Sequence, residues 1–358
     1  MDIKNSKRPY IIAGPCSAET ETQVMKTAKL LSDNGVNVFR AGIWKPRTRP
    51  GNFEGVGSKG LKWLKQVKDE TGMQVTTEVA NTKHVYEALK AGIDILWIGA
   101  RTSANPFAVQ EIADTLTGMD IPVMIKNPIN ANIDLWIGAV ERFQKAGISN
   151  IAAIHRGFST YTKSKYRNEP MWQIPVELRR RMKDLPIICD PSHISGRRDL
   201  LQSVSQKAMD LNYEGLMIET HIDPDNALSD AKQQITPDNL KILIDNLIIR
   251  HRQSTDADIP ENLESLEELR TKIDDYDNII FDYLNKRMAV AKNIGTVKKK
   301  SNITILQTDR WNEIMENAVK KGKELGLSAK FVNKFFQAIH QESIQQQTEI
   351  YKRLSKEQ

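Results

Sequence analysis

The sequence predicts an α/β fold, a (β/α)8 TIM barrel, followed by a small all-α domain of three helices. Up to about residue 250, eight short apolar runs alternate with stretches of helical periodicity, as expected of parallel strands joined by crossover helices. After residue 260 no strand-like run remains. The 358 residues suffice for one domain of ~250 residues and a second of ~100 residues.

The predicted strands are spaced regularly along the first part of the chain. They are residues 10–14, 36–40, 74–78, 94–99, 122–126, 150–155, 186–190 and 215–219. Helical patterns separate them, for example at residues 19–34, 58–71, 133–146 and 198–211. A doubly wound open sheet is the alternative, but eight such units favour a closed barrel.

A polar stretch at residues 251–262 is expected to link a first domain, residues 1–250, to a second, residues 263–358. Helical periodicity then runs to about residue 299, and shorter helices are expected at residues 308–322 and 328–353. A helix of ~37 residues is ~55 Å long, which exceeds the width of a compact 100-residue domain. We therefore expect a homodimer in which this helix packs along a second copy of the chain.

Composition excludes several classes of function. The mean hydropathy of −0.47 and the lack of a long apolar run argue against a membrane partner. Two cysteines, Cys16 and Cys189, are too few for a disulfide framework and fit a reducing cytoplasm. The net charge of +6 is spread over both parts without a basic tail, so we expect small anionic substrates and no nucleic acid.

Reactive side chains follow the predicted strands, where a barrel gathers them at one mouth. Singly, each has a structural interpretation, such as a buried thiol or a solvated charge. Reactive residues follow all eight predicted strands, which is improbable by chance and favours an active site. These residues are Cys16, Arg40, Lys45, Arg47, Glu78, Arg101, Lys126, Arg156, His193, Glu219 and Asp230.

Two chemistries are indicated at this mouth. Cys16, His193, Glu219 and Asp230 form a mixed donor set for one divalent metal ion, which does not select sharply among Mn, Fe, Co and Zn. The basic residues exceed what one carboxylate needs and indicate a phosphorylated carboxylic acid, with Arg47 and Thr48 suited to a second phosphate. A metal with two anionic substrates points to Lewis-acid activation of a carbonyl.

Several separate motifs within residues 8–250 carry a family resemblance. They are AGPCS (13–17), RAGIWKPRT (40–48), GARTSANP (99–106), IKNP (125–128), HRG (155–157), DPSH (190–193) and GLMIET–SD (215–230). This part of the chain resembles the short type I-beta class of 3-deoxy-D-arabino-heptulosonate 7-phosphate (DAHP) synthases. The resemblance implies condensation of phosphoenolpyruvate with erythrose 4-phosphate to DAHP and phosphate, which opens the shikimate pathway of aromatic amino acid biosynthesis.

The resemblance also implies roles for the residues. Cys16, His193, Glu219 and Asp230 would bind the metal. Arg101 and Arg156 would hold the phosphate of phosphoenolpyruvate, and Lys126 with Arg40 its carboxylate. Lys45 would act as an acid near the aldehyde, and Arg47 with Thr48 would take the erythrose phosphate. Glu78 would handle the attacking water, although an ion pair at the barrel rim explains it equally well.

The alternative for the barrel is Kdo-8-phosphate synthase, which shares the phosphoenolpyruvate pocket. The loop that selects the sugar phosphate typically reads KANRS in that family, whereas this chain has Lys-Pro-Arg-Thr at residues 45–48. The four-carbon sugar is therefore preferred.

The helical part carries ELRTKID (268–274), NKRMAVAKNIGTVK (285–298), Arg310 and ESIQQQ (342–347). Over residues 263–353 it resembles the all-helical chorismate mutases, which implies rearrangement of chorismate to prephenate. Lys298 and Gln347 would then stabilise the ether oxygen as its charge develops. Arg287 and Arg310 would engage a carboxylate or support the pocket. Ser343, a further substrate-binding candidate, lies one helical turn before Gln347 on the same face.

Arg270 lies seventeen residues before Arg287, ~25 Å along one helix. Both cannot hold one small ligand from the same straight helix, so we expect Arg270 of the partner subunit to contribute. Gln307 and Trp311 depart from the family, which often has acids there, and Trp311 cannot accept a hydrogen bond. The alternative to a catalytic mutase is a helical domain that only senses a ligand or mediates dimerisation.

We further expect the helical domain to regulate the barrel, with prephenate as the inhibitor.

Overall fold

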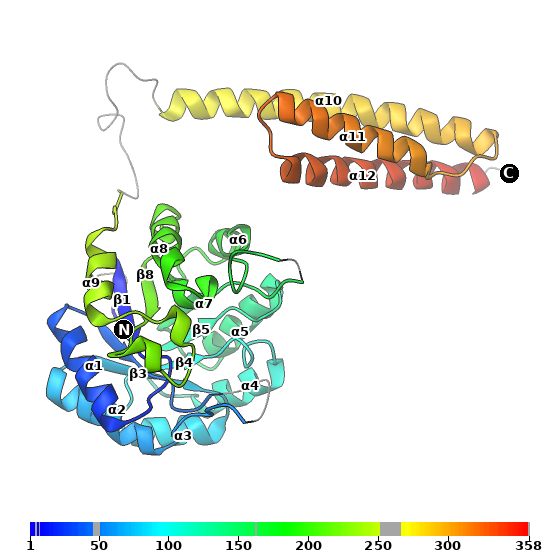
Figure 1. Ribbon diagram of the computed structural model, residues 1–358. Coiled ribbons are helices and arrows are strands. Elements are labelled where there is room, and N and C mark those ends of the chain that lie inside the picture. The colour runs from blue at the N-terminus through cyan, green and yellow to red at the C-terminus, as the bar shows by residue number, and fades with distance from the viewer. Residues whose placement is uncertain (4–5, 7, 46–50, 162, 251–265, 357–358) are drawn as a thin grey trace. The chain divides into compact units, whose positions relative to one another are not determined.

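The computed structural model describes residues 1–3, 6, 8–45, 51–161, 163–250 and 266–356 (Figure 1). The chain divides into two compact units, Met1–Arg252 and Gln253–Gln358. In the first unit, eight strands form a closed barrel in sequence order, and β1 pairs in parallel with both β2 and β8. The predicted (β/α)8 fold is confirmed. The proposed linker and the site residues Arg47 and Thr48 lie outside the described residues.

Each predicted strand run coincides with an observed strand, apart from small shifts at the ends. The strands are β1 (Tyr10–Gly14), β2 (Val38–Arg40), β3 (Gln74–Val79), β4 (Ile95–Ile98), β5 (Val123–Lys126), β6 (Ile151–His155), β7 (Ile187–Cys189) and β8 (Gly215–Glu219). All the pairings around the barrel are parallel.

Helices follow the strands and surround the barrel (Figure 1). They are α1 (Glu21–Asp33), α2 (Lys59–Thr71), α3 (Thr82–Lys90), α4 (Pro106–Thr115), α5 (Ile133–Lys145), α6 (Gln173–Arg181), α7 (Pro191–Ser195), α8 (Leu201–Asp210) and α9 (Pro237–Asp245). Asparagine fixes the start of three of them, because the side chains of Asn81, Asn105 and Asn132 accept first-turn N–H groups. The short α7 follows β7 and brings His193 to the barrel mouth.

The core has two layers because successive side chains of a strand point to opposite faces. One apolar cluster lies between strands and helices, and a second fills the barrel interior. A residue two positions beyond an interior residue shares its side of the sheet. Three charged residues follow interior apolar residues in this way: Arg40 after Val38, Lys126 after Met124, and Glu219 after Met217. Strand periodicity therefore directs charged groups into the carboxyl end of the barrel.

The second unit consists of α10 (Leu266–Lys300), α11 (Thr308–Glu324) and α12 (Ala329–Lys356), which confirms the three-helix prediction (Figure 1). Helix α12 packs along α10 and against α11. Only Ala291 and Gly295 of α10 are buried. Apolar side chains in its first half, including Ile273, Tyr276 and Ile280, are exposed. No helix in the described part of the chain has the length and apolar character needed to cross a membrane.

Candidate active sites

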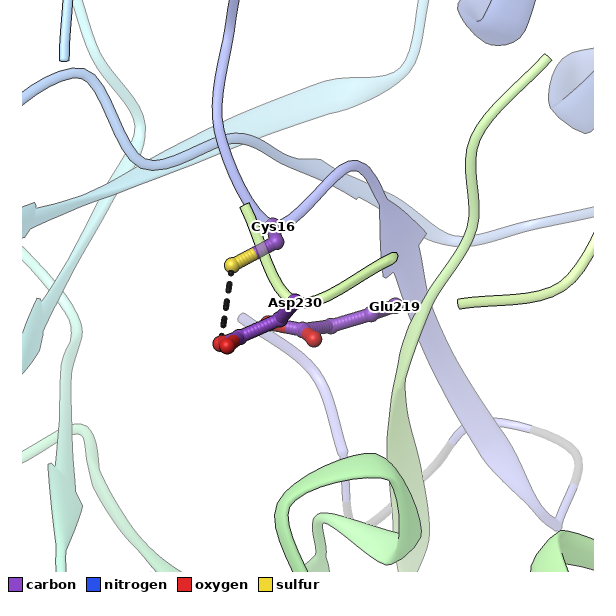
Figure 2. Close-up of side chains that lie close together, drawn as sticks. All are labelled: Cys16, Glu219 and Asp230. Carbon is purple, nitrogen blue, oxygen red and sulfur yellow. Dashed lines mark hydrogen bonds between the residues drawn. The ribbon is translucent and has the colours of Figure 1, made fainter. Parts of the chain in front are cut away.

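Three of the four predicted metal ligands lie together at the barrel mouth. The ligand atoms of Cys16, Glu219 and Asp230 all lie within 4.8 Å of one another. Cys16 Sγ lies 3.3 Å from Asp230 Oδ2, and Figure 2 shows the three side chains converging. Cys16 follows β1 by two residues, Glu219 ends β8, and Asp230 precedes a 3-10 turn at Ala231–Gln233.

His193 lies at the edge of this group. Its Nε2 atom is 3.7 Å from Glu219 Oε1. Its Nδ1 atom is 2.8 Å from Asp190 Oδ2, but the geometry of this second contact is not that of a hydrogen bond. Asp190 also accepts a hydrogen bond of 2.8 Å from Lys126 Nζ. Burial alone would raise the pKa of Asp190, but His193 and Lys126 hold it well below its usual range. The anion at position 190 therefore orients both a predicted ligand and a predicted substrate-binding lysine.

The donor atoms of this group fit a divalent cation. Glu219 Oε1 is buried and has no hydrogen-bond partner among the described residues. Burial, and then the charge of Glu219, raise the pKa of the Cys16 thiol to about 12. A bound cation would stabilise both groups, because it would pair with the Glu219 carboxylate and favour the Cys16 thiolate over the thiol. The site is therefore suited to hold a metal ion, which agrees with the sequence prediction for these residues.

Basic side chains border the same group. Arg40 Nη2 lies 3.3 Å from Glu219 Oε1, and Lys45 Nζ donates to Cys16 Sγ at 2.9 Å. The Arg40 guanidinium and the Lys126 ammonium lie over the ring of Trp97, at 4.8 and 6.0 Å from its centre. Arg40 Nε and Nη1 are buried without a hydrogen-bond acceptor in the described structure. These donors are available to an anionic ligand.

Arg156 connects the basic side chains to the ligand group through Asn168. Burial lowers the pKa of Arg156 to about 10, and the charge of Arg101 at the exposed rim acts in the same direction. Arg156 Nη1 donates to Asn168 Oδ1 at 2.9 Å, and Asn168 Nδ2 donates to the His193 carbonyl at 2.6 Å. The buried Asn168 amide therefore orients Arg156, which is predicted to bind phosphate, and the segment that carries His193, which is predicted to bind the metal.

The Glu78 side chain lies on the interior side of the barrel and forms no ion pair with the described residues of the rim. Its carboxylate accepts a hydrogen bond of 3.1 Å from Trp97 Nε1, and no ion pair of Glu78 occurs among the described residues. Gly99 makes room for this carboxylate, because a Cβ atom there would lie 2.0 Å from Glu78 Oε1. Glu78 therefore lies beside the Trp97 ring, which the Arg40 guanidinium also contacts.

A second network holds the two metal-site carboxylates. Arg167 Nη1 donates to Asp230 Oδ1 at 3.0 Å and to Gln233 Oε1 at 2.7 Å. Gln233 Nε2 donates to Glu219 Oε2 at 2.6 Å. Sequence reasoning missed Arg167, Asn168 and Gln233 because the first two lie in an irregular loop and the third in a single 3-10 turn. Segments of this kind have no periodicity that signals which side chains turn inward.

The second unit contains a cavity of about 840 Å³ bounded by all three helices. Six predicted residues line it: Arg287, Lys298, Gln307, Arg310, Ser343 and Gln347. Arg287 Nη1 donates to Ser343 Oγ, and Lys298 Nζ donates to the Ile305 carbonyl, both at 2.6 Å. Arg270 is exposed, pairs with Glu267 at 3.3 Å and does not line the cavity.

Gln347 is placed by a close helix approach. A Cβ atom at Gly295 would lie only 3.1 Å from Gln347 Cα, so glycine allows α10 and α12 to meet here. Gln347 Oε1 is buried without a hydrogen-bond partner in the described structure. An unpaired buried polar atom is costly, and a ligand in the cavity would satisfy this side chain.

A family model described as the DAHP synthetase I family matches residues 2–250. The chain belongs to this family. A second model, chorismate mutase type II, matches residues 269–348. The chain therefore carries a DAHP synthase and a chorismate mutase and is a bifunctional enzyme of the shikimate pathway.

Individual relatives agree with the DAHP synthase family. The phospho-2-dehydro-3-deoxyheptonate aldolase of Thermotoga maritima is 35% identical over 237 residues, which are 66% of this chain and 68% of that protein. A crystal structure of the DAHP synthase from Thermotoga maritima has a TM-score of 0.61 at 34% identity, covering 68% of this chain and 70% of that chain.

A protein from the alternative enzyme class is less similar. The 2-dehydro-3-deoxyphosphooctonate aldolase of Legionella pneumophila (strain Lens) is 27% identical over 260 residues, covering 66% of this chain and 90% of that protein. The greater identity to the heptonate aldolase supports DAHP synthase over Kdo-8-phosphate synthase.

Proposed function

We propose that Cys16, His193, Glu219 and Asp230 hold one divalent metal ion, which is Mn, Fe, Co or Zn. The observation that carries this proposal is the convergence of three of these ligands, among them Glu219, whose buried Oε1 atom has no hydrogen-bond partner among the described residues. When bound, the metal would polarise the carbonyl group of erythrose 4-phosphate. His193 joins the set by a small movement, because its Nε2 is already 3.7 Å from Glu219.

The basic residues position the two substrates. Arg101 and Arg156 bind the phosphate of phosphoenolpyruvate, and Lys126 and Arg40 bind its carboxylate. The two unpaired donors of Arg40 support this role. Arg47 and Thr48 bind the phosphate of erythrose 4-phosphate. Holding two anions side by side converts a bimolecular condensation into a reaction within one complex.

Lys45 and Glu78 act on the reacting groups. Lys45 donates a proton to the aldehyde oxygen as the carbon–carbon bond forms, and its contact with Cys16 Sγ keeps it close to the metal site. Glu78 orients the water that attacks the enol phosphate carbon. The half-buried position of Glu78, whose carboxylate accepts from Trp97 Nε1, supports this role over a structural rim charge.

In the mutase, Lys298 and Gln347 donate hydrogen bonds to the ether oxygen of chorismate, where negative charge grows in the transition state. Arg287, Arg310 and Gln307 contact the substrate, and Ser343 holds Arg287. Gln347 and Lys298 line the same cavity, which supports this assignment. Arg270 of the partner subunit completes the site, because the same helix cannot bring Arg270 to the cavity of its own chain.

The mutase domain also forms the homodimer. Helix α10 has 35 residues, about 52 Å at 1.5 Å per residue, and its first half exposes an apolar face. Prephenate bound to this domain inhibits the barrel. Deleting residues 255–358 should abolish prephenate inhibition and leave a folded synthase, and persisting inhibition would disprove the coupling. The enzyme acts in the cytoplasm.

Two substitutions separate the activities. Cys16→Ala should abolish metal-dependent synthase activity and leave chorismate rearrangement intact. Lys298→Ala should retain synthase activity and lose ~10²-fold or more in mutase rate. Unchanged prephenate formation by Lys298→Ala would show that the mutase assignment is wrong.

A further inference from the structure

His340 is a residue of the helical cavity that sequence reasoning did not select. It lines the cavity together with Arg287, Lys298 and Gln347. On α12 it precedes Ser343 by three residues and Gln347 by seven, so the three side chains share one helix face. The imidazole stacks on the Trp311 ring of α11, with 3.8 Å between ring centres and 17° between planes. A flat contact of this kind fixes the ring plane and leaves the nitrogen atoms at its edge.

The cavity is lined by three cations and by several neutral polar residues, which besides His340 are Thr304, Gln307, Thr308, Ser343 and Gln347. Arg287, Lys298 and Arg310 donate only, which matches the two carboxylates of chorismate. Ser343 Oγ is occupied, because it accepts from Arg287 and donates to the Ile339 carbonyl at 2.8 Å. Asp309 borders the cavity from an exposed position at the start of α11. The secondary hydroxyl of chorismate both donates and accepts, so its proton needs a neutral or anionic partner that the three cations cannot provide.

The ring nitrogens of His340 have no hydrogen-bond partner in the described part of the chain. Burial, followed by the charges of Arg287 and Lys298 on α10, lowers the pKa of His340. Helix α11 adds the charged groups of Asp309 and Arg310 to the same cavity. The imidazole is therefore neutral at pH 7 and offers one donor and one acceptor. That pair of functions suits a hydroxyl group, which both donates and accepts.

We propose that His340 hydrogen-bonds the hydroxyl group of chorismate, and that Trp311 holds the imidazole in the orientation for this contact. The proposal rests on the mutase function proposed above and names a further substrate-binding residue of that site. It also explains how an indole at position 311 serves the pocket: the indole supports a hydrogen-bonding ring and makes no hydrogen bond to the hydroxyl itself.

The test uses the full chain and two substrates, chorismate and an analogue that lacks the hydroxyl group. His340→Phe keeps an aromatic ring for stacking and removes both nitrogens, whereas His340→Gln keeps a neutral donor and acceptor. His340→Phe should lower kcat/KM for chorismate by about tenfold, the size of one lost neutral hydrogen bond. It should leave kcat/KM for the analogue unchanged, and His340→Gln should recover part of the loss.

Equal effects of His340→Phe on both substrates would overturn the proposal, because a packing role does not depend on the hydroxyl. No effect on either substrate would overturn it as well. Synthase activity and the thermal unfolding of each variant report whether the chain is folded. If the wild-type chain rearranges chorismate and Lys298→Ala does not, the mutase assignment stands whatever His340→Phe does, so the two failures are distinguishable.

Discussion

The buried amide of Asn168 offers a strong test of how the barrel site is held. Its side chain accepts from Arg156 and donates to the His193 carbonyl, so Asn168→Ala removes one charge-assisted and one neutral hydrogen bond. Bonds of these kinds contribute about 1.5–3 and 0.5–1.5 kcal/mol, respectively. We therefore expect the free energy of unfolding of the barrel to fall by about 2–4 kcal/mol in urea titrations.

Asn168→Ala should weaken the binding of phosphoenolpyruvate and of the metal together. The KM for phosphoenolpyruvate should rise because Arg156 loses its orientation, and metal affinity should weaken ~10-fold or more because His193 is less well held. Asn168→Asp is the matched control: it keeps an acceptor for Arg156 but cannot donate to the His193 carbonyl. It should preserve the KM better than the affinity for metal. If Asn168→Ala changes only stability, the amide does not position the site.

Two further predictions concern packing and pH. Gly295→Ala places a methyl group 3.1 Å from Gln347 Cα, so α12 must shift by tenths of an ångström; steady-state assays should show a lower mutase kcat with normal synthase activity, and an unchanged kcat would contradict the close-approach argument. Burial lowers the pKa of His155 from 6.5 to about 4. As the pH falls from 6.5 to 4, the unfolded barrel therefore binds this proton before the folded barrel does. The free energy of unfolding should fall by about 3 kcal/mol over this pH range. His155→Phe should lessen this decline in urea unfolding, and an identical decline would contradict it.

Sequence patterns predicted the barrel because strand alternation and helical periodicity are local properties. They also located the mouth residues, since Arg40, Lys126 and Glu219 each extend the inward side of a strand. Local patterns could not show that Asn168, Arg167 and Gln233 turn inward, because loop conformation depends on contacts with distant segments. Asp190 could have been selected from its place just after β7, beside His193.

The helical part illustrates the same limit. Periodicity predicted three helices, and the helix rise alone separated Arg270 from Arg287 of the same chain. The stacking of His340 on Trp311 joins α12 to α11 and depends on tertiary packing. The residue at position 340 therefore gave no signal on its own.

We propose above that the barrel mouth is a metal-dependent site for phosphoenolpyruvate and a four-carbon sugar phosphate. The most direct measurement is phosphoenolpyruvate consumption with erythrose 4-phosphate and with arabinose 5-phosphate, after chelation and after addition of each divalent metal. We predict that a metal restores activity with erythrose 4-phosphate alone. Full activity after chelation would contradict the metal site, and preference for arabinose 5-phosphate would contradict the assignment of the sugar.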